Sequence, residues 1–283
     1  MTEGLSLEGK AFLVTGCGSG IGREAARVLA LRGARVVGTG RTLEKARQAC
    51  AGFAGNPLPV ACELGEPGSV RACAESVKSQ GLELSGIICN AGIMAVPRLE
   101  LAHGYELQFF TNHIGHFLLV TSLLDALSPN ARIVMVSSEL HRRAPAVGID
   151  FENLRGELRY NAWEAYGRSK FANVLFAKQL ARRFAGTART ANALHPGVIR
   201  TELQRHMPGF VAKAMSAIAP IAFKSVEEGA ATEVYVAARP ELADTSGQFF
   251  ANCNVARARP DTDDAQLAER LWQVSERIAR ASC

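Results

Sequence analysis

The chain has 283 residues, of which 48% are hydrophobic and 21% charged, and its 32 basic and 27 acidic side chains leave a formal net charge of +5. This composition allows a substantial buried core and excludes a chain that is disordered along its length. The basic residues are spread along the sequence without a long run, which argues against a nucleic-acid-binding protein. One α/β domain spanning residues 1–283 is compatible with this length.

The 7 cysteines include no CxxC pair and no cysteine–histidine cluster with the spacing of a zinc site. We therefore expect reduced thiols, mostly small core residues, and no bound metal. Residues 1–10 lack the basic segment and apolar run of a signal peptide, and no stretch has the roughly 18 uninterrupted apolar residues of a membrane span. The expected location is cytoplasmic.

Short apolar runs alternate with longer segments of helical periodicity. The alternation predicts successive β-α-β units, and therefore a three-layer α/β fold with a Rossmann-type doubly wound parallel sheet of about seven strands. Residues 257–264 are polar and are expected to form a loop before a short terminal helix. The expected strands are 11–15, 34–39, 59–64, 86–90, 132–137, 190–195 and 248–251, and the clearest helical segments are 20–32 and 171–184.

The first expected strand runs into the glycine-rich sequence TGCGSGIG, residues 15–22, and then into a helix. Gly16, Gly20 and Gly22 permit a tight turn and close approach of the backbone to a pyrophosphate. The N-terminus of the following helix supplies free N–H groups and a positive dipole end. A glycine motif alone is a weak signal, but the strand-turn-helix context favours a dinucleotide-binding site.

The end of the second expected strand indicates which dinucleotide binds. An acidic residue there would hold the ribose 2′-hydroxyl of NAD, but Gly40 and Arg41 stand in its place. A guanidinium can pair with the 2′-phosphate of NADP, whereas a carboxylate would repel it. We therefore expect NADP(H) to be preferred over NAD(H). The alternative is that Arg41 is a solvated arginine that opens a helix.

Two later segments carry side chains suited to proton transfer. Tyr166 and Lys170 are spaced to fall on one helix face. A phenol with a pKa of about 10 is a poor donor or base at neutral pH unless a nearby cation stabilises the phenolate, which Lys170 can do. Ser137 and Ser138 lie at the carboxyl end of an expected strand, where ligands of α/β folds bind and where a hydroxyl could donate to a substrate carbonyl.

These motifs resemble the short-chain dehydrogenase/reductase family over residues 9–250. Their order is specific: TGxxxGxG at 15–22, NAG at 90–92, an asparagine at 112, a serine pair ending at 138, YxxxK at 166–170 and PG at 196–197. The resemblance implies an oxidoreductase that interconverts a carbonyl compound, ketone or aldehyde, and its alcohol by hydride transfer. It also implies a catalytic tetrad of Asn112, Ser138, Tyr166 and Lys170.

The resemblance assigns roles to these residues. Tyr166 exchanges a proton with the substrate oxygen, which Ser138 polarises. Lys170 binds ribose hydroxyls, and Asn112 supports a proton-relay water. Glu63 replaces the aspartate that usually touches the adenine. The residues expected to bind the cofactor are Gly16, Ser19, Gly20, Ile21, Gly22, Arg41, Glu63, Leu64, Asn90, Ala91, Gly92, Tyr166, Lys170, Pro196, Gly197, Val198 and Thr201.

Within the family, residues 112–117 and the long interval between Ser138 and Tyr166 resemble the retinol dehydrogenase and WW-domain oxidoreductase branch, which also favours NADP. The N-terminal membrane anchor of several retinol dehydrogenases is missing from the sequence, so a retinoid substrate is not inferred. The resemblance makes a homodimer or homotetramer reasonable.

Other residues admit other interpretations. His113, His116, His141 and His195 lack metal-ligand spacing with carboxylates and are interpreted as structural or solvent-facing. Ser138 with His195 could suggest a hydrolase, but the GxSxG elbow is missing. Arg142 and Arg143 either lie in a solvated loop or flank the site entrance. The alternative to an enzyme is a catalytically weak NADP-sensing regulatory protein, against which the intact tetrad argues.

Residues 202–223 are expected to form a lid over the substrate. They follow Thr201 at the cofactor edge and carry many apolar side chains, with prolines and Gly209 at hinge-like turns. Such a cover would enclose a hydrophobic small-molecule carbonyl or alcohol. The alternative is a helix pair that packs permanently on the core or against another subunit.

Overall fold

The structure, a computed structural model, describes residues 2–198 and 224–282. Within these residues, eight strands form one central sheet. Their order across the sheet is β10-β9-β8-β7-β4-β1-β2-β3, and every neighbouring pair is parallel except β9 and β10. The strands are β1 (Ala11–Val14), β2 (Arg35–Gly40), β3 (Leu58–Ala61), β4 (Leu84–Cys89), β7 (Leu127–Val136), β8 (Thr190–His195), β9 (Phe249–Ala251) and β10 (Asn254–Ala256). The seven expected strands are confirmed, and β10 is an addition.

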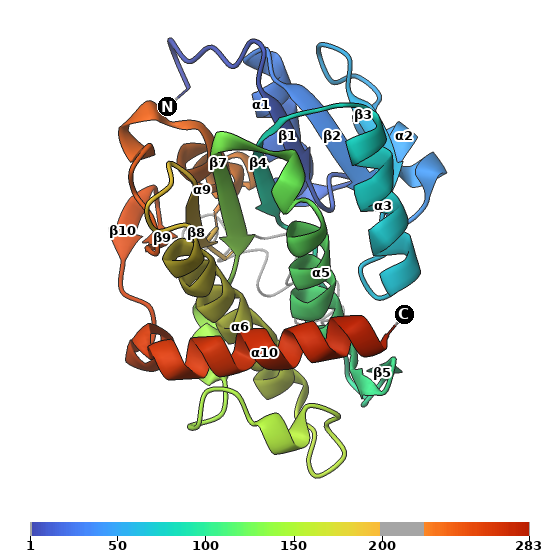
Figure 1. Ribbon diagram of the computed structural model, residues 1–283, viewed down its shortest axis with the longest axis vertical. Helices are drawn as coiled ribbons and strands as arrows, with labels where there is room; N and C mark the ends of the chain where they lie inside the picture. Colours follow the sequence, from blue (N-terminus) through green and yellow to red (C-terminus); the bar gives the residue numbers. More distant parts are fainter. Residues whose placement is uncertain (1, 199–223, 283) are drawn as a thin grey trace, which may run out of the picture.

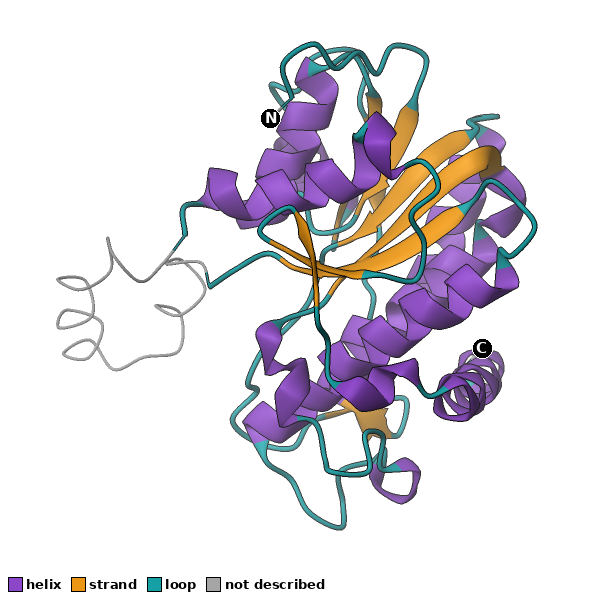
Figure 2. Cartoon of the chain, turned by 90° about the vertical axis from the view of Figure 1, so that its left-hand side faces the viewer, coloured by secondary structure: helices purple, strands orange, loops and turns teal. Residues whose placement is uncertain are grey.

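Helices cover both faces of this sheet and give three layers (Figures 1 and 2). One face packs against α3 (Pro67–Ser79), α5 (Gly115–Ser122) and α6 (Ala162–Arg183). The other packs against α1 (Gly20–Leu31), α2 (Leu43–Cys50) and α9 (Val226–Ala238). The predicted Rossmann-type α/β fold is therefore confirmed.

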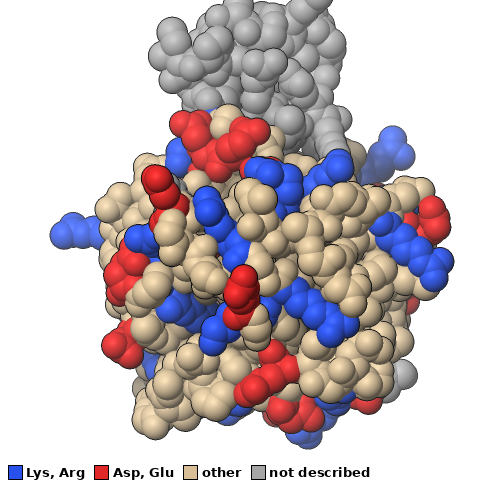
Figure 3. All heavy atoms as spheres, turned by 90° about the horizontal axis from the view of Figure 1, so that it is seen from above, with Lys and Arg blue, Asp and Glu red and all other residues tan. Residues whose placement is uncertain are grey.

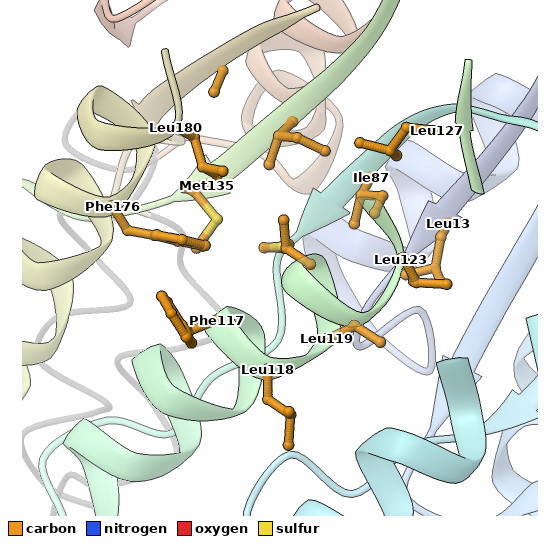
Figure 4. Close-up of a cluster of buried hydrophobic side chains, with 14 of the residues drawn as sticks. Leu13, Ile87, Phe117, Leu118, Leu119, Leu123, Leu127, Met135, Phe176 and Leu180 are labelled. Carbon is orange, nitrogen blue, oxygen red and sulfur yellow. The ribbon is translucent and has the colours of Figure 1, made fainter. Parts of the chain in front are cut away.

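The strand side chains alternate between the two cores. In β1, Leu13 contributes to the core under α3, α5 and α6, while Phe12 and Val14 contribute to the opposite core. Figure 4 shows Leu13 and Met135 on the sheet together with Phe117 and Phe176 from α5 and α6. Because both faces are buried, each central strand appears in the sequence as a continuous apolar run.

The C-terminal helix differs from the expectation. After a 3₁₀ turn at Pro260–Asp263, α10 (Ala265–Ala281) extends over 17 residues, so the prediction of a short helix was wrong. Its buried residues, including Leu271, Trp272 and Ile278, recur at helical spacing, and this apolar stripe packs along α6 and α5. Figure 1 shows α10 crossing in front of α6.

Smaller elements complete the described chain. A two-stranded hairpin of β5 (Leu101–Ala102) and β6 (Tyr105–Glu106) leads into α4 (Leu107–Phe109) and a π-helix at Phe110–Ile114. The remaining 3₁₀ turns are Leu124–Ala126, Glu139–Arg143, Phe151–Asn153 and Pro240–Leu242. Across residues 2–198 and 224–282, none of the helices combines the length and apolar character needed to cross a bilayer.

Candidate active site

The strand order reverses direction between β1 and β4, which lie side by side at the centre of the sheet. In open α/β sheets, ligands bind beside such a switch point at the carboxyl ends of the strands. The glycine-rich turn follows β1, and Asn90, Ala91 and Gly92 follow β4. Two motifs that are far apart in the sequence therefore meet at this edge.

Hydrogen bonds join these two motifs into one surface. The Asn90 side-chain amide donates to the Thr15 carbonyl at 2.9 Å, and the Ala91 N–H donates to Thr15 Oγ1 at 3.0 Å. Gly16 has φ +70°, a conformation that L side chains rarely adopt. A Cβ on Gly22 would lie 2.1 Å from Asn90 Nδ2, so only glycine allows this close packing.

The N-terminus of α1 opens onto the same edge. Ser19 occupies the N-cap position without capping the helix through its side chain, and both Gly18 and Ser19 are exposed. The first-turn N–H groups of α1 therefore remain available to an anion. This arrangement fits the pyrophosphate of a dinucleotide.

Arg41 follows β2, the strand beside β1, and is exposed. Among the described residues, its guanidinium makes no hydrogen bond or ion pair. Thr42 next to it caps α2 by accepting a hydrogen bond from the Lys45 N–H at 3.2 Å. The chain thus presents an unpaired cation at the carboxyl end of the strand where a 2′-phosphate would be recognised.

Two further expected cofactor segments also lie at this edge. Glu63 is half-buried after β3, and its N–H donates to Ser69 Oγ at 3.0 Å, while Leu64 is buried. Pro196, Gly197 and Val198 follow β8 at the same edge of the sheet. Thr201 and the lid predicted at 202–223 lie outside the described residues.

Asn112 occupies the middle of the π-helix and is fully buried. Its Oδ1 accepts from the Ile93 N–H at 2.8 Å, and its Nδ2 donates to the Ile93 carbonyl and to Ser169 Oγ, both at 2.9 Å. The side chain therefore holds the segment after β4 against α6. Single-turn π-helices are frequent at functional sites because they re-aim one residue of a helix.

His116 connects Asn112 to the glycine-rich turn. Its Nδ1 lies 2.9 Å from the Asn112 carbonyl, which can only accept, so the proton is assigned to Nδ1. Its Nε2 then accepts from Thr15 Oγ1 at 2.9 Å. The sequence indicated only a structural or solvent-facing histidine here, and no spacing signal marks this link between the two ends of the site.

Tyr166 and Lys170 lie on α6, and both are almost completely buried. The Lys170 ammonium is 5.7 Å from the centroid of the Tyr166 ring and donates to the Val136 carbonyl at 2.9 Å. A Cβ on Gly92 would lie 3.0 Å from Asn112 Oδ1 and 3.3 Å from Lys170 Nζ. The structure therefore brings Asn112 and Lys170 beside Gly92, with the Tyr166 ring next to the Lys170 ammonium.

Ser138 follows β7 and caps the 3₁₀ turn Glu139–Arg143 by accepting from the Leu140 N–H at 3.2 Å. The hydroxyl proton of Ser138 is left to donate to a ligand. A Cβ on Gly167 would lie 2.7 Å from the Leu140 carbonyl oxygen, so α6 packs directly on this turn. This contact brings the turn that begins at Ser138 against the helix that carries Tyr166.

A buried ion pair ties α6 to the segment before Asn112. The Glu106 carboxylate accepts from the Gln108 and Phe109 N–H groups, and it lies 3.5 Å from the Arg168 guanidinium. Both side chains are at most 5% exposed. Burial lowers the pKa of Arg168, and the Glu106 charge opposes that effect. Pattern reasoning missed this pair, whose members come from distant parts of the chain.

The remaining candidate residues are interpreted as structural or solvent-facing. His113 and His141 are buried, with hydrogen bonds to Ser275 Oγ and to the Ser138 carbonyl. His195 is half-buried at the end of β8, and burial lowers its pKa to about 4. Arg142 and Arg143 are exposed in the 3₁₀ turn. The cysteines at the described positions are free thiols, as expected for reduced core residues, and all are buried except the half-buried Cys253.

We expect acid to destabilise the fold through two buried histidines. Burial lowers the pKa of His113 to about 3 and that of His116 to about 4, below the value of about 6.5 expected in the unfolded chain. As the pH falls below about 6.5, the unfolded chain therefore binds protons first, and stability decreases toward about pH 4. Urea unfolding should show a loss on the order of 1–2 kcal/mol per histidine between about pH 6.5 and about pH 5.

The variant His113→Gln should flatten this pH dependence in part, since it removes one buried ring with a lowered pKa while His116, His141 and His195 remain. The variant His103→Gln is the matched control, because His103 is exposed. An equal slope in the wild type and in His113→Gln would contradict the assignment.

A family model for short chain dehydrogenases matches residues 10–209, which include the glycine-rich turn, Asn112, Ser138 and the Tyr166–Lys170 pair. The chain belongs to the short-chain dehydrogenase/reductase family. It is therefore an oxidoreductase that acts on CH–OH groups, as the motif order predicted. Members of this family use NAD(P) cofactors and small-molecule substrates.

Full-length relatives support the same assignment. Retinol dehydrogenase 14 of Homo sapiens is 39% identical over 293 residues, covering 95% of this chain and 86% of that protein. Short-chain dehydrogenase TIC 32 A, chloroplastic, of Brassica napus is 36% identical, covering 99% and 92%. A solved structure of an uncharacterized protein from Mycobacterium paratuberculosis has a TM-score of 0.78 at 32% identity, covering 98% and 95%. The predicted likeness to the retinol dehydrogenase branch is confirmed.

Proposed function

We propose that this protein is an NADP(H)-dependent oxidoreductase that interconverts a hydrophobic ketone or aldehyde and its alcohol. The observation that carries the proposal is that Asn112 and Lys170 lie beside Gly92, with the Tyr166 ring next to the Lys170 ammonium. This arrangement supports one ligand that extends from the turn to the catalytic helix.

Different residues of the chain would bind different parts of the cofactor. The glycine-rich turn, with Gly16, Ser19, Gly20, Ile21 and Gly22, would hold the pyrophosphate by backbone N–H groups. Arg41 would pair with the 2′-phosphate, and Glu63 with Leu64 would border the adenine. Asn90, Ala91, Gly92, Pro196, Gly197 and Val198 would line the path toward the nicotinamide, which supplies or accepts the hydride when bound.

The catalytic residues would handle the proton and the oxygen. In reduction, the Tyr166 hydroxyl would protonate the carbonyl oxygen, and in oxidation its phenolate would take the alcohol proton. The Lys170 ammonium, 5.7 Å from the ring centroid, would stabilise that phenolate and bind the ribose hydroxyls. Ser138 would donate to the substrate oxygen, and Asn112 would hold a relay water.

Replacing Arg41 with alanine is expected to weaken NADPH binding by about tenfold to hundredfold, because one charge-assisted hydrogen bond contributes about 1.5–3 kcal/mol. NADH affinity should change little, since NADH has no 2′-phosphate. Titration of each cofactor by its fluorescence checks this difference. The variant Arg47→Ala, which removes another exposed arginine from α2, is the matched control. Equal losses for both cofactors would remove Arg41 from the phosphate site.

The identity of the relatives suggests where to begin the substrate search. Several are retinol dehydrogenases, so an apolar alcohol and aldehyde such as retinol and retinal form the first pair to test. The test is to follow NADPH consumption with a panel of apolar and charged carbonyl compounds. Turnover of the apolar members supports the proposal. Tight NADPH binding without turnover would instead favour an NADP-sensing regulatory protein.

We also propose a cytoplasmic location and a homodimer or homotetramer. The free cysteines of the described chain support a reducing compartment. The family likeness supports the assembly. Light scattering and cell fractionation test these two points directly.

A further inference from the structure

A cavity of about 470 Å³ lies at the amino ends of β1, β2, β4 and β7, at the edge of the sheet opposite to the candidate active site. Volumes of this size are typical of small-molecule sites. None of the residues proposed for catalysis or cofactor binding lines it. Its polar lining consists of Lys10, Arg35, Glu83, Ser85, Ser128 and Asn130.

Cations without partners gather at this edge. Arg35 opens β2 opposite Ala11, and its N–H donates to the Lys10 carbonyl at 2.9 Å, which holds the two basic residues side by side. Among the described residues, neither the Lys10 ammonium nor the Arg35 guanidinium has a hydrogen-bond or ion-pair partner. The Nε atoms of Arg35 and of nearby Arg32 are shielded from solvent and also lack an acceptor.

The surroundings add positive charge and further donors. The Arg189 guanidinium donates to the Leu127 carbonyl at 2.6 Å and to the Ser128 carbonyl at 3.1 Å, so it is held next to Ser128, which lines the cavity. Asn130 Oδ1 accepts from Ser128 Oγ at 3.1 Å, which leaves the Asn130 amide NH₂ group to donate. Figure 3 looks onto this edge and shows several Lys and Arg side chains across the middle of the face, with acidic side chains between and around them.

One acidic residue, Glu83, lines the same cavity but is exposed and pairs with neither cation. An unpaired guanidinium with a shielded Nε is unfavourable, because that donor has lost water without gaining an acceptor. A bound oxyanion would supply the missing acceptor and offset the repulsion between the two cations. A guanidinium fork beside an ammonium matches the oxygens of a phosphoryl group.

We propose that this amino-edge cavity binds a small phosphate-bearing anion, either a phosphate monoester or free phosphate, through Arg35 and Lys10. The Asn130 amide and the Ser85 hydroxyl would donate to the remaining oxygens, since the Ser128 hydroxyl proton already goes to Asn130 Oδ1. This site is separate from the coenzyme phosphates, which belong to the opposite edge of the sheet. The volume leaves room for an organic group attached to the phosphate.

The test is calorimetric titration of the protein with inorganic phosphate and, separately, with glucose 6-phosphate as a monoester probe. Saturating NADPH is present so that the coenzyme's phosphate positions are occupied. We expect one anion per chain to bind at constant ionic strength. Tighter binding of the monoester identifies a phosphorylated metabolite as the ligand class, and tighter binding of inorganic phosphate identifies the free ion.

Variants locate the binding. Arg35→Gln and Lys10→Gln should each weaken the anion by about tenfold to hundredfold, as expected for a lost charge-assisted hydrogen bond, and Glu83→Gln should tighten it. Lys10 is exposed, so its replacement keeps the test valid if Arg35→Gln fails to fold. Arg277→Gln, an exposed arginine on α10, is the charge-matched control. Absence of binding, or equal affinities in Lys10→Gln and Arg277→Gln, would overturn the proposal.

Discussion

Replacing Tyr166 with phenylalanine is expected to lower turnover by about 10²-fold or more while NADPH affinity stays near that of the wild type. The substitution removes the hydroxyl that would exchange the proton with the substrate. It keeps the ring that lies 5.7 Å from the Lys170 ammonium, so the packing of α6 is preserved. Steady-state kinetics and a cofactor titration on the same preparation measure both quantities.

The control for this substitution is Tyr235→Phe, which removes a phenol hydroxyl from α9 on the other side of the sheet. Its turnover should match that of the wild type. If Tyr166→Phe also keeps nearly full turnover, Tyr166 does not donate the proton.

The second large effect is expected on stability, from the buried pair of Glu106 and Arg168. Glu106→Gln keeps the shape of the side chain but leaves the Arg168 cation, 5% exposed, without its counter-charge. Breaking a buried ion pair on one side typically costs about 3–5 kcal/mol in the free energy of unfolding. Urea denaturation at neutral pH measures this loss.

Two comparisons separate burial of charge from general damage. The double variant Glu106→Gln with Arg168→Met should lose much less than the sum of the single variants, because no unpaired charge stays buried. Glu164→Gln breaks the exposed pair with Arg159 and should cost less than about 1 kcal/mol. If Glu106→Gln costs no more than Glu164→Gln, the pair does not stabilise the fold.

The central sheet could be predicted because its strands are buried on both faces and appear as apolar runs. The short edge strand β10 (Asn254–Ala256) could not, since two of its three residues are exposed and give no apolar signal. The length of α10 was underestimated because its buried residues are interleaved with many charged ones. Its apolar stripe indicates a long packed helix only when α6 is known to lie against it.

In the candidate site, too, some features could be predicted from the sequence and others could not. The glycine-rich turn and the Tyr166–Lys170 pair depend on local spacing, which the sequence displays. The hydrogen-bond partners of Asn112 do not depend on local spacing, because Ile93 and Ser169 reach it from separate segments of the chain. The His116 link and the unpaired cations at the amino edge likewise arise only when the strands are assembled.

Deuterium transfer tests the proposed reaction most directly. Two samples of NADPH, each deuterated on one face of nicotinamide C4, are incubated with the protein and an apolar aldehyde such as retinal. Mass spectrometry of the alcohol should find deuterium on the carbinol carbon with one of the two samples and not with the other, and Tyr166→Phe should slow its appearance by about 10²-fold or more. Bound NADPH with no deuterated alcohol from any carbonyl in the panel would contradict hydride transfer and leave the protein as a nucleotide-binding regulator.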